Sequence, residues 1–258
     1  MKISVIQMNI EHGKPENNRK NAVRLIEEAA ASRPDVILLP EMWTTGYDLD
    51  NIDHICDIDA VPTLPLLKEL AARHKVNLVC GSFANKENGK LYNTAFMIDR
   101  EGNAVGKYSK VHLFKLMGEH NCFASGRECC IFELDGVKCG LIICYDLRFP
   151  ELARKLALAG IKVLFVPAEW PAARMEHWVT LLRARAIENQ IFVAAANRAG
   201  SEEVEEFAGG SMLIDPWGNI VAHAEGGEQI LDGALDLGII DRIKSKIDIL
   251  GDRMPEVY

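Results

Sequence analysis

The chain has 258 residues, 48% of them hydrophobic, and a formal net charge of −8. This length and composition allow a sizeable core, and α/β domains of about 250 residues are often undivided. The negative charge argues against general nucleic-acid binding, which needs a basic surface. Because no linker, composition shift or repeat interrupts the chain, we expect one domain over residues 1–258.

The N-terminus, the lengths of the apolar segments and the cysteines indicate the cellular compartment. The opening MKISVIQMNI alternates in polarity and lacks the apolar stretch and cleavage site of a signal peptide. No segment approaches the roughly 20 apolar residues that a membrane-spanning helix needs. The seven cysteines are odd in number and scattered, which favours reduced thiols over a disulfide framework. We therefore expect a cytoplasmic protein with no membrane partner.

Hydrophobic periodicity divides the first half of the chain into alternating elements. Strands are predicted at Lys2–Met8, Val36–Leu39 and Asn77–Cys80, and helices between them at Asn18–Ala30 and Leu64–Arg73. A hairpin follows, with strands at Tyr92–Ile98 and Ala104–Tyr108. The hairpin is indicated by the turn sequence DREG between its two strands.

The second half begins and nearly ends with further hairpins. Hairpins are predicted at Cys130–Glu133 with Val137–Ile143 and at Met212–Ile214 with Ile220–Ala224. Between them, helices at Pro150–Ala159 and Met175–Asn189 alternate with strands at Val163–Val166 and Phe192–Asn197. One more strand and a short helix are expected from Gly233 onward. Helices that alternate with strands, and strands that form hairpins, predict an α/β fold with two mixed sheets in a four-layer α/β/β/α sandwich.

Several common site motifs are missing. Cys122, Cys129 and Cys130 lie near one another, but there is no C-x-x-C pair and no H-E-x-x-H, so we expect no metal site. Neither a P-loop nor a dinucleotide-binding glycine motif is present. Ser211 follows two glycines but departs from G-x-S-x-G, so it reads as the start of a strand rather than as a nucleophile.

Cys144 is the first candidate for chemistry. In GLIICYDLRFPE it follows a buried strand and precedes a charged turn, with Pro150 at a predicted helix start. A nucleophilic cysteine needs a base or cation nearby and a donor for the oxyanion, which free N–H groups of a helical turn can supply. Taken alone, a cysteine at a strand end is more often a packing residue.

Two further segments bear on whether Cys144 is a packing residue or a nucleophile. Glu41, in LLPEMWTTGYD, follows a buried strand, where a carboxylate is costly to bury. Lys110, in GKYSKVHLF, lies among apolar residues after another predicted strand. A surface acid and an ordinary solvated lysine are the alternatives for each residue alone.

Together, Glu41, Lys110 and Cys144 in these contexts resemble the nitrilase, or carbon–nitrogen hydrolase, superfamily. The resemblance runs essentially end to end and includes LPE, K-x-H-L-F, ICYD-RFPE, ARAIENQ and DPWG. It implies the same α/β/β/α sandwich. It also implies a reaction that needs no metal or organic cofactor.

The resemblance assigns roles to five residues. Cys144 would attack an amide-type carbon, and Glu41 would take the thiol proton and later activate water. Lys110 and the backbone N–H of Tyr145 would stabilise the oxyanion. Glu119, in KLMGEHN, matches a second glutamate of the family and would orient substrate and lysine.

Within the superfamily, the chain looks most similar to omega-amidases, which act on 2-oxo acid amides such as 2-oxoglutaramate and 2-oxosuccinamate. Such a substrate carries a remote carboxylate that a cation or hydroxyl must hold. Tyr47 and Arg174 are candidates for this contact, and Trp170 is a candidate pocket wall. Arg148 is another candidate, although its place beside Cys144 suggests a structural ion pair.

Three alternatives and two unassigned segments remain. The protein could instead hydrolyse N-carbamoyl amines or amino acids, serve as a catalytically silent scaffold, or act as a redox-sensing thiol protein. The acidic segment Gly200–Gly209 is expected to be a solvated loop, with Glu202, Glu203, Glu205 and Glu206. Residues 247–258 resemble C-terminal arms that cross a dimer interface in the family, which implies a homodimer.

Overall fold

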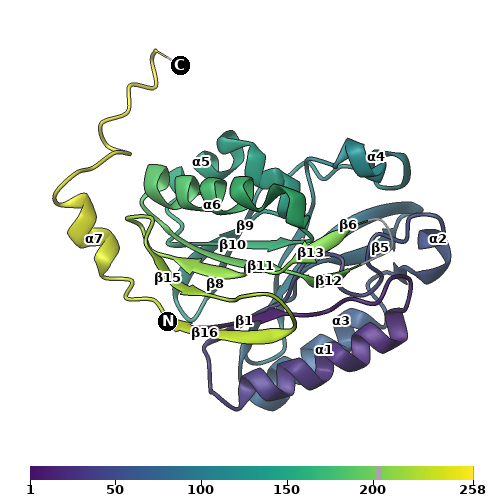
Figure 1. Ribbon diagram of the computed structural model, residues 1–258. Coiled ribbons are helices and arrows are strands. Elements are labelled where there is room, and N and C mark those ends of the chain that lie inside the picture. Colours follow the sequence, from purple (N-terminus) through teal and green to yellow (C-terminus); the bar gives the residue numbers. More distant parts are fainter. Residues whose placement is uncertain (202–204, 258) are drawn as a thin grey trace.

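Two β-sheets lie face to face with helices on their outer sides in the computed structural model, which describes residues 1–201 and 205–257 (Figure 1). The first sheet has the strand order β16-β1-β2-β4-β6-β5-β3, with β7 paired to β6. Its strands are β1 (Lys2–Gln7), β2 (Val36–Leu38), β3 (Asp57–Ile58), β4 (Asn77–Val79), β5 (Phe83–Glu87), β6 (Lys90–Ile98), β7 (Ala104–Ser109) and β16 (Gln229–Ala234).

The second sheet has the order β15-β14-β11-β10-β9-β8. Its strands are β8 (Cys130–Leu134), β9 (Val137–Leu141), β10 (Val163–Ala168), β11 (Phe192–Asn197), β14 (Met212–Ile214) and β15 (Ile220–His223). Both sheets combine parallel and antiparallel pairs, and all three predicted hairpins pair antiparallel. The predicted mixed sheets are therefore confirmed.

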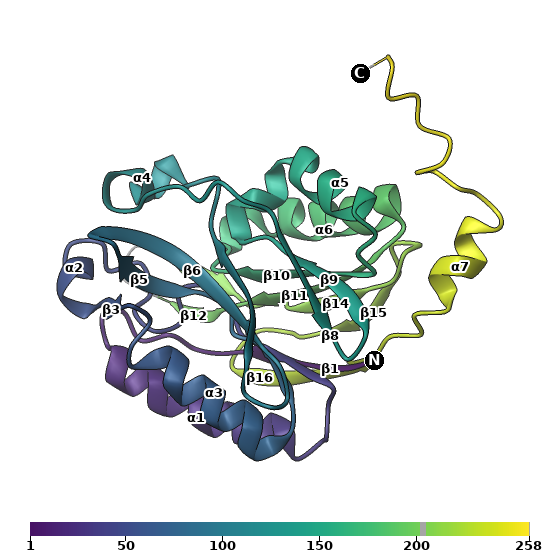
Figure 2. The same ribbon diagram turned by 180° about the vertical axis from the view of Figure 1, so that it is seen from behind.

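The helices form the two outer layers. Helices α1 (Pro15–Ala30) and α3 (Thr63–His74) cover the first sheet, while α5 (Pro150–Leu158) and α6 (Met175–Asn189) cover the second (Figures 1 and 2). Shorter helices are α2 (Ile52–Ile55), α4 (Glu119–Cys122) and α7 (Ile239–Lys244), and 3-10 turns occupy Lys115–Met117, Cys144–Arg148 and Ala172–Arg174. This is the predicted four-layer α/β/β/α sandwich.

The alternation of side chains along each strand builds two cores. On β2, Val36 and Leu38 belong to the cluster between the two sheets, whereas Ile37 belongs to the cluster that includes Ile26 of α1 and Leu67 of α3. Successive strand residues face opposite sides of a sheet, so a strand buried on both faces needs a continuous apolar run. Each such side chain contributes roughly 1.5–3 kcal/mol by burial.

The differences from prediction are in short or largely polar strands. The segment expected to be an acidic loop contains β12 (Ala199–Ser201) paired with β13 (Glu206–Ala208), although Glu202 and Glu203 lie outside the described residues. β3 and β5 were not predicted, and β16 begins at Gln229, before Gly233. An edge strand such as β3 obtains its backbone hydrogen bonds from one neighbour without needing an apolar pattern. β5 lies between β6 and β3, but only its Phe83 and Ala84 are apolar, so periodicity reveals neither strand.

Candidate active site

Cys144 lies at a sharp corner of the chain. It follows β9 by three residues and is the first residue of its 3-10 turn, with a backbone φ of +46°. A left-handed conformation is uncommon for a residue with a side chain and is costly unless the surroundings hold it. The Sγ atom lies 3.8 Å from the backbone oxygen of Glu169, which follows β10.

The next residue supplies a free backbone donor. Tyr145 is the second residue of the same turn, and N–H groups at the start of a helical turn have no partner within it. Among the described residues, no acceptor binds the Tyr145 N–H. This donor, next to the sulfur, is available to an oxyanion.

Glu41 follows β2 and is fully buried. Its Oε1 accepts hydrogen bonds from Lys110 Nζ at 2.8 Å and from Asn93 Nδ2 at 2.9 Å. Its Oε2 accepts the backbone N–H of Glu169 at 2.8 Å. The Glu169 peptide therefore touches both the carboxylate and the cysteine, and it directs Oε2 toward the sulfur's side of the site.

Lys110 follows β7 and lies between two carboxylates. Its Nζ is 2.8 Å from Glu41 Oε1 and 2.8 Å from Glu119 Oε2, and all three side chains are 0% exposed. Glu119 begins α4, and its Oε2 also accepts the Phe114 N–H at 2.6 Å. A buried charge is tolerated when it is paired and hydrogen-bonded, which these contacts achieve.

Tyr47 completes the cluster. Its hydroxyl donates to Glu41 Oε1 at 2.7 Å, accepts from Lys110 Nζ at 3.1 Å, and lies 3.3 Å from Glu119 Oε1. The predicted contact of Tyr47 with a substrate carboxylate stays a prediction. The contacts of its hydroxyl in this structure are with Glu41, Glu119 and Lys110.

The surroundings determine the protonation states of the cluster. Burial raises the pKa of the Cys144 thiol well above its ordinary value, and the charge of Glu41 adds to this more than Lys110 offsets it. Burial lowers the pKa of Lys110, but the charges of Glu119 and Glu41 outweigh burial and hold it well above its usual value. The resting site therefore contains a thiol and a charged lysine, so the cysteine needs a base to become nucleophilic.

A small pocket opens beside Cys144. Its walls are Phe114, Cys144, Tyr145, Arg148, Glu169, Trp170, Pro171 and Arg174. The indole N–H of Trp170 donates to the backbone oxygen of Arg174 at 2.9 Å, which joins two predicted substrate-binding residues in one wall. Arg174 Nη1 is buried and has no hydrogen-bond partner among the described residues.

The expected structural ion pair of Arg148 is wrong. Among the described residues, no carboxylate pairs with this guanidinium, which lies 4.7 Å from the centre of the Trp170 ring and contacts His177 Nδ1 at 3.3 Å. The neighbouring acid, Asp146, is bonded instead to groups from another segment. The walls of the pocket therefore include two arginines, Arg148 and Arg174.

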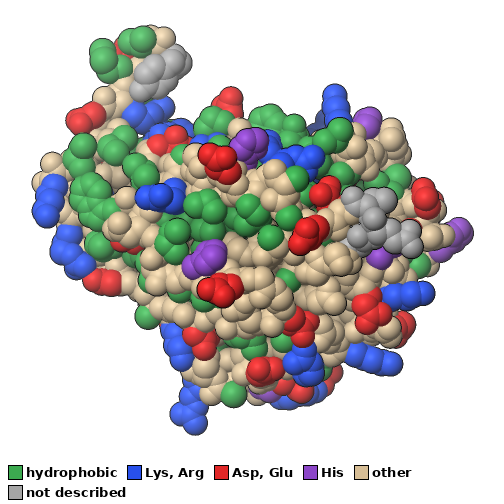
Figure 3. Space-filling model, in the orientation of Figure 1, with side chains coloured by type: hydrophobic (Ala, Val, Ile, Leu, Met, Phe, Trp, Pro, Cys, Tyr) green, Lys and Arg blue, Asp and Glu red, His purple; other side chains and the backbone are tan. Residues whose placement is uncertain are grey.

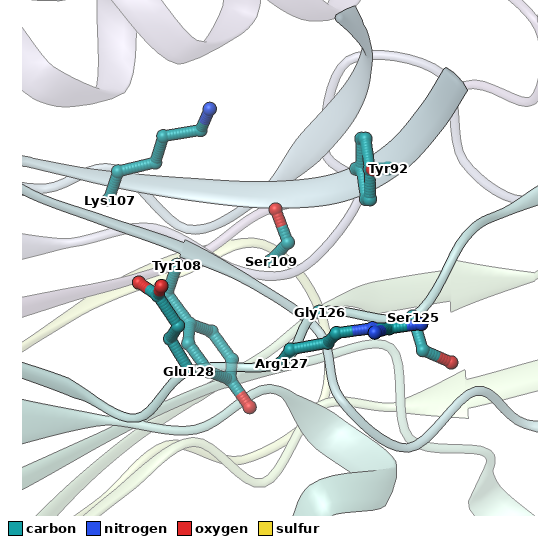
Figure 4. Close-up of a pocket in the computed structure, with 8 residues that line it drawn as sticks. All are labelled: Tyr92, Lys107, Tyr108, Ser109, Ser125, Gly126, Arg127 and Glu128. Atoms are coloured by element: carbon teal, nitrogen blue, oxygen red, sulfur yellow. The ribbon is translucent and has the colours of Figure 1, made fainter.

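A second hollow lies along β7, the strand that precedes Lys110. It is lined by Tyr92, Lys107, Tyr108, Ser109, Ser125, Gly126, Arg127 and Glu128 (Figure 4). Neither Cys144 nor Glu41 contributes to its walls. The smaller pocket beside the sulfur is therefore the candidate site.

Within the described part of the chain, no group of three or more His, Cys, Asp or Glu side chains could hold a metal ion. All seven cysteines are free. No helix over the described residues is both long and apolar enough to cross a membrane.

Comparisons with known proteins agree with this geometry. Residues 2–245 match the carbon–nitrogen hydrolase family, and the chain belongs to it. It is 46% identical to a 2-oxoglutaramate amidase from Bacillus subtilis (strain 168), over 99% of this chain and 98% of that protein. It is 31% identical to an omega-amidase from Xenopus laevis, over 100% and 96% of the two chains.

A solved structure is similarly close. A carbon–nitrogen hydrolase superfamily protein from Xanthomonas campestris, with an arsenic adduct in its active site, superposes with a TM-score of 0.92. The two are 30% identical, and the match covers 98% of this chain and 97% of that chain. The resemblance and the fold inferred from the sequence are confirmed.

Sequence reasoning missed two contributors to the site. Asn93 on β6 donates to Glu41 and, at 3.1 Å, to Glu119 Oε1, and the Glu169 N–H holds the other oxygen of Glu41. The polar Asn93 within the run LYNTAFMI was a detectable signal, because a buried amide in a strand requires partners. A backbone N–H leaves no signal in the sequence.

Proposed function

We propose that this protein is a thiol amidohydrolase that cleaves the amide of a small carboxylate-bearing 2-oxo acid, such as 2-oxoglutaramate or 2-oxosuccinamate. The observation that carries this proposal is the buried Glu41–Lys110–Glu119 cluster beside Cys144. The pocket at Cys144 is also lined by Arg174, whose Nη1 has no hydrogen-bond partner among the described residues. Relatives called 2-oxoglutaramate amidase and omega-amidase support the same substrate class.

Glu41 starts the reaction by taking the proton of Cys144, which is a thiol at rest. The sulfur then bonds to the amide carbon, and the carbonyl oxygen becomes an oxyanion near Lys110 Nζ and the Tyr145 N–H. Donors placed where charge develops contribute more than donors in water, because they need no reorganisation.

The intermediate collapses when Glu41 returns the proton to the leaving nitrogen. The carbon–nitrogen bond breaks, ammonia leaves, and a thioester to Cys144 remains. Glu41 next takes a proton from water, whose oxygen attacks the thioester carbon. The carbon–sulfur bond breaks, the sulfur regains a proton, and the carboxylic acid is released.

Arg174 is the proposed anchor for the remote carboxylate. A guanidinium binds a carboxylate through charged, often bidentate hydrogen bonds, and a buried unpaired donor is costly until it obtains such a partner. Arg148, with no carboxylate partner among the described residues, adds a second positive charge to the same pocket. Trp170 supplies a flat wall that contacts both arginines.

Ammonia release from 2-oxoglutaramate, 2-oxosuccinamate, N-carbamoyl putrescine and a simple nitrile tests the proposal. We expect kcat/KM to be highest for one of the two 2-oxo amides and Cys144→Ala to remove turnover. A preference for the carbamoyl compound would replace the assignment with N-carbamoyl amine hydrolysis. Turnover of no compound would favour a silent scaffold.

We further infer a cytoplasmic homodimer. Exposed apolar side chains support an interface: Trp217, Ile220, Val221 and Ile247 are each 43–47% exposed. Hydrophobic side chains gather on the side of the molecule where β15 and α7 lie (Figure 3), and the C-terminal arm projects from the body there (Figure 1). Analytical ultracentrifugation should give twice the mass of one chain, and a monomer would exclude the dimer.

A further inference from the structure

Asp146 is buried beside the nucleophile and takes no part in the steps above. It is 0% exposed and lies two residues after Cys144. Its Oδ2 accepts the Ile143 N–H at 3.0 Å and the Tyr108 hydroxyl at 2.7 Å. Its Oδ1 accepts the backbone N–H of His112 at 2.9 Å and contacts His112 Nδ1 at 2.8 Å.

These contacts join two segments that are distant in the sequence. Ile143 belongs to the corner that holds Cys144 in its left-handed conformation. Tyr108 and His112 lie two residues before and two residues after Lys110. Asp146 therefore binds the chain on both sides of the lysine and also the residue that precedes the cysteine.

The partners of Asp146 are suited to a fixed bridge. Burial and the charge of Asp146 raise the pKa of Tyr108 well above its ordinary value, so its hydroxyl remains a donor. The His112 ring stacks on Phe149 with centroids 3.6 Å apart and planes inclined by 8°. Phe149 follows the turn of Cys144, and its N–H donates to the Asp146 backbone oxygen at 3.0 Å.

We propose that Asp146 is a positioning residue that holds the two oxyanion donors, Lys110 Nζ and the Tyr145 N–H, at the separation the tetrahedral intermediate requires. The proposal rests on the proposed amidase function. The two donors come from different sheets, so neither sheet alone determines their separation. A displacement of about 1 Å in such groups can lower the rate by about 10²-fold.

The test compares turnover with alkylation in Asp146→Asn. Iodoacetamide reacts with the sulfur by displacement and forms no oxyanion, so its rate at Cys144, followed by peptide mass spectrometry, reports the thiol and its base alone. We expect kcat on 2-oxoglutaramate to fall by about 10²-fold, with KM and the Cys144 alkylation rate changed only a few-fold. Tyr108→Phe removes one donor and should lower kcat in the same direction by less.

Asp57→Asn is the matched control. Asp57 is also a buried aspartate, and its Oδ2 accepts the Thr63 N–H at 2.8 Å, but it lies on β3 and contacts no residue of the site. It should lower the melting temperature and leave kcat unchanged.

Three results would overturn the proposal. Wild-type kcat in Asp146→Asn would show that the bridge does not position the donors. A parallel loss of turnover and alkylation in both Asp146→Asn and Tyr108→Phe would show a merely structural role. If wild-type protein releases ammonia from no amide, the proposed function fails first, before any variant is compared, and this inference fails with it.

Discussion

At the scale of single residues, the site shows how one side chain acquires its chemical state from its neighbours. Cys144 is more than nine-tenths buried and faces the negative charge of Glu41, so its pKa is raised and its thiol is protonated at rest. A redox-sensing cysteine needs thiolate character, which this environment opposes. The arrangement favours a sulfur that is activated only when Glu41 accepts its proton.

Arg174→Met is the prediction at this scale. Methionine keeps much of the length of the side chain and removes the charge, so the proposed partner of the substrate carboxylate is lost. We expect KM for 2-oxoglutaramate to rise by about 10–100-fold, since a hydrogen bond to a charged group contributes about 1.5–3 kcal/mol. Steady-state kinetics should show kcat changed much less than KM.

Arg127→Met is its control. Arg127 lines the second hollow of Figure 4, outside the pocket of Cys144, so its replacement should leave KM unchanged. An uncharged amide of similar size provides a second comparison. If Arg174→Met raises KM equally for the uncharged amide, Arg174 is a packing residue and not the carboxylate anchor.

At the scale of elements, strand ends place the reacting groups. Glu41 follows β2, Lys110 follows β7 and Cys144 follows β9, so each group sits where a rigid strand passes into irregular chain. The end of β7 is held on its outer side by Gly126, whose N–H donates to the Lys110 backbone oxygen at 2.8 Å. A Cβ at Gly126 would lie 1.9 Å from the backbone oxygen of Ser109.

Gly126→Ala is therefore expected to displace the strand end that carries Lys110. Alanine cannot fit at this distance, so the segment around residues 124–128 or the end of β7 must move. We expect stability to fall by about 1–3 kcal/mol, as overpacking usually costs, and kcat to fall at least tenfold. Urea unfolding and ammonia release from the folded protein measure the two effects.

Gly226→Ala is the matched control. The nearest heavy atom to a Cβ at Gly226 is the Ala208 backbone oxygen at 3.9 Å, which is an ordinary contact. Neither glycine has a left-handed backbone, so both substitutions test space alone. Full activity and stability in Gly126→Ala would contradict the close packing of Gly126 on β7.

At the scale of the whole molecule, the two hydrophobic cores enclose thiols. Burial raises the pKa of Cys130 and of Cys139 to about 12, and burial raises that of Cys80 further. In the unfolded chain these thiols ionise near the ordinary value of 9.0. Between about pH 9 and pH 12, the unfolded chain therefore binds fewer protons than the folded protein.

This difference predicts a loss of stability in alkali. Stability falls with rising pH wherever the unfolded state binds fewer protons, by up to about 1.4 kcal/mol per pH unit for each thiol. We expect the free energy of unfolding in urea to be level near pH 8 and to fall steadily above about pH 9. Cys130→Ala should begin from a lower stability and fall less steeply, and an unchanged slope would contradict the raised pKa of Cys130.

Local sequence patterns predicted most of the helices and strands in their order and the candidate residues Glu41, Lys110 and Cys144. Apolar runs revealed the strands buried on both faces, turn residues revealed three hairpins, and the motifs around Glu41, Lys110 and Cys144 identified the family. These features are local, since each depends on residue types within a few positions of one another. The short or largely polar strands β3, β5 and β12 lacked such a pattern and were missed.

The contacts between these groups, and the charge of each group, follow from the tertiary structure alone. It placed Asn93 and the Glu169 N–H on Glu41, left Arg148 without a carboxylate partner among the described residues, and bonded Asp146 to both sides of Lys110. The raised pKa of Cys144 likewise follows from burial and from a carboxylate about a hundred positions away along the chain. Hydrogen bonds and electrostatic fields depend on distance in space, and two sheets folded face to face set those distances.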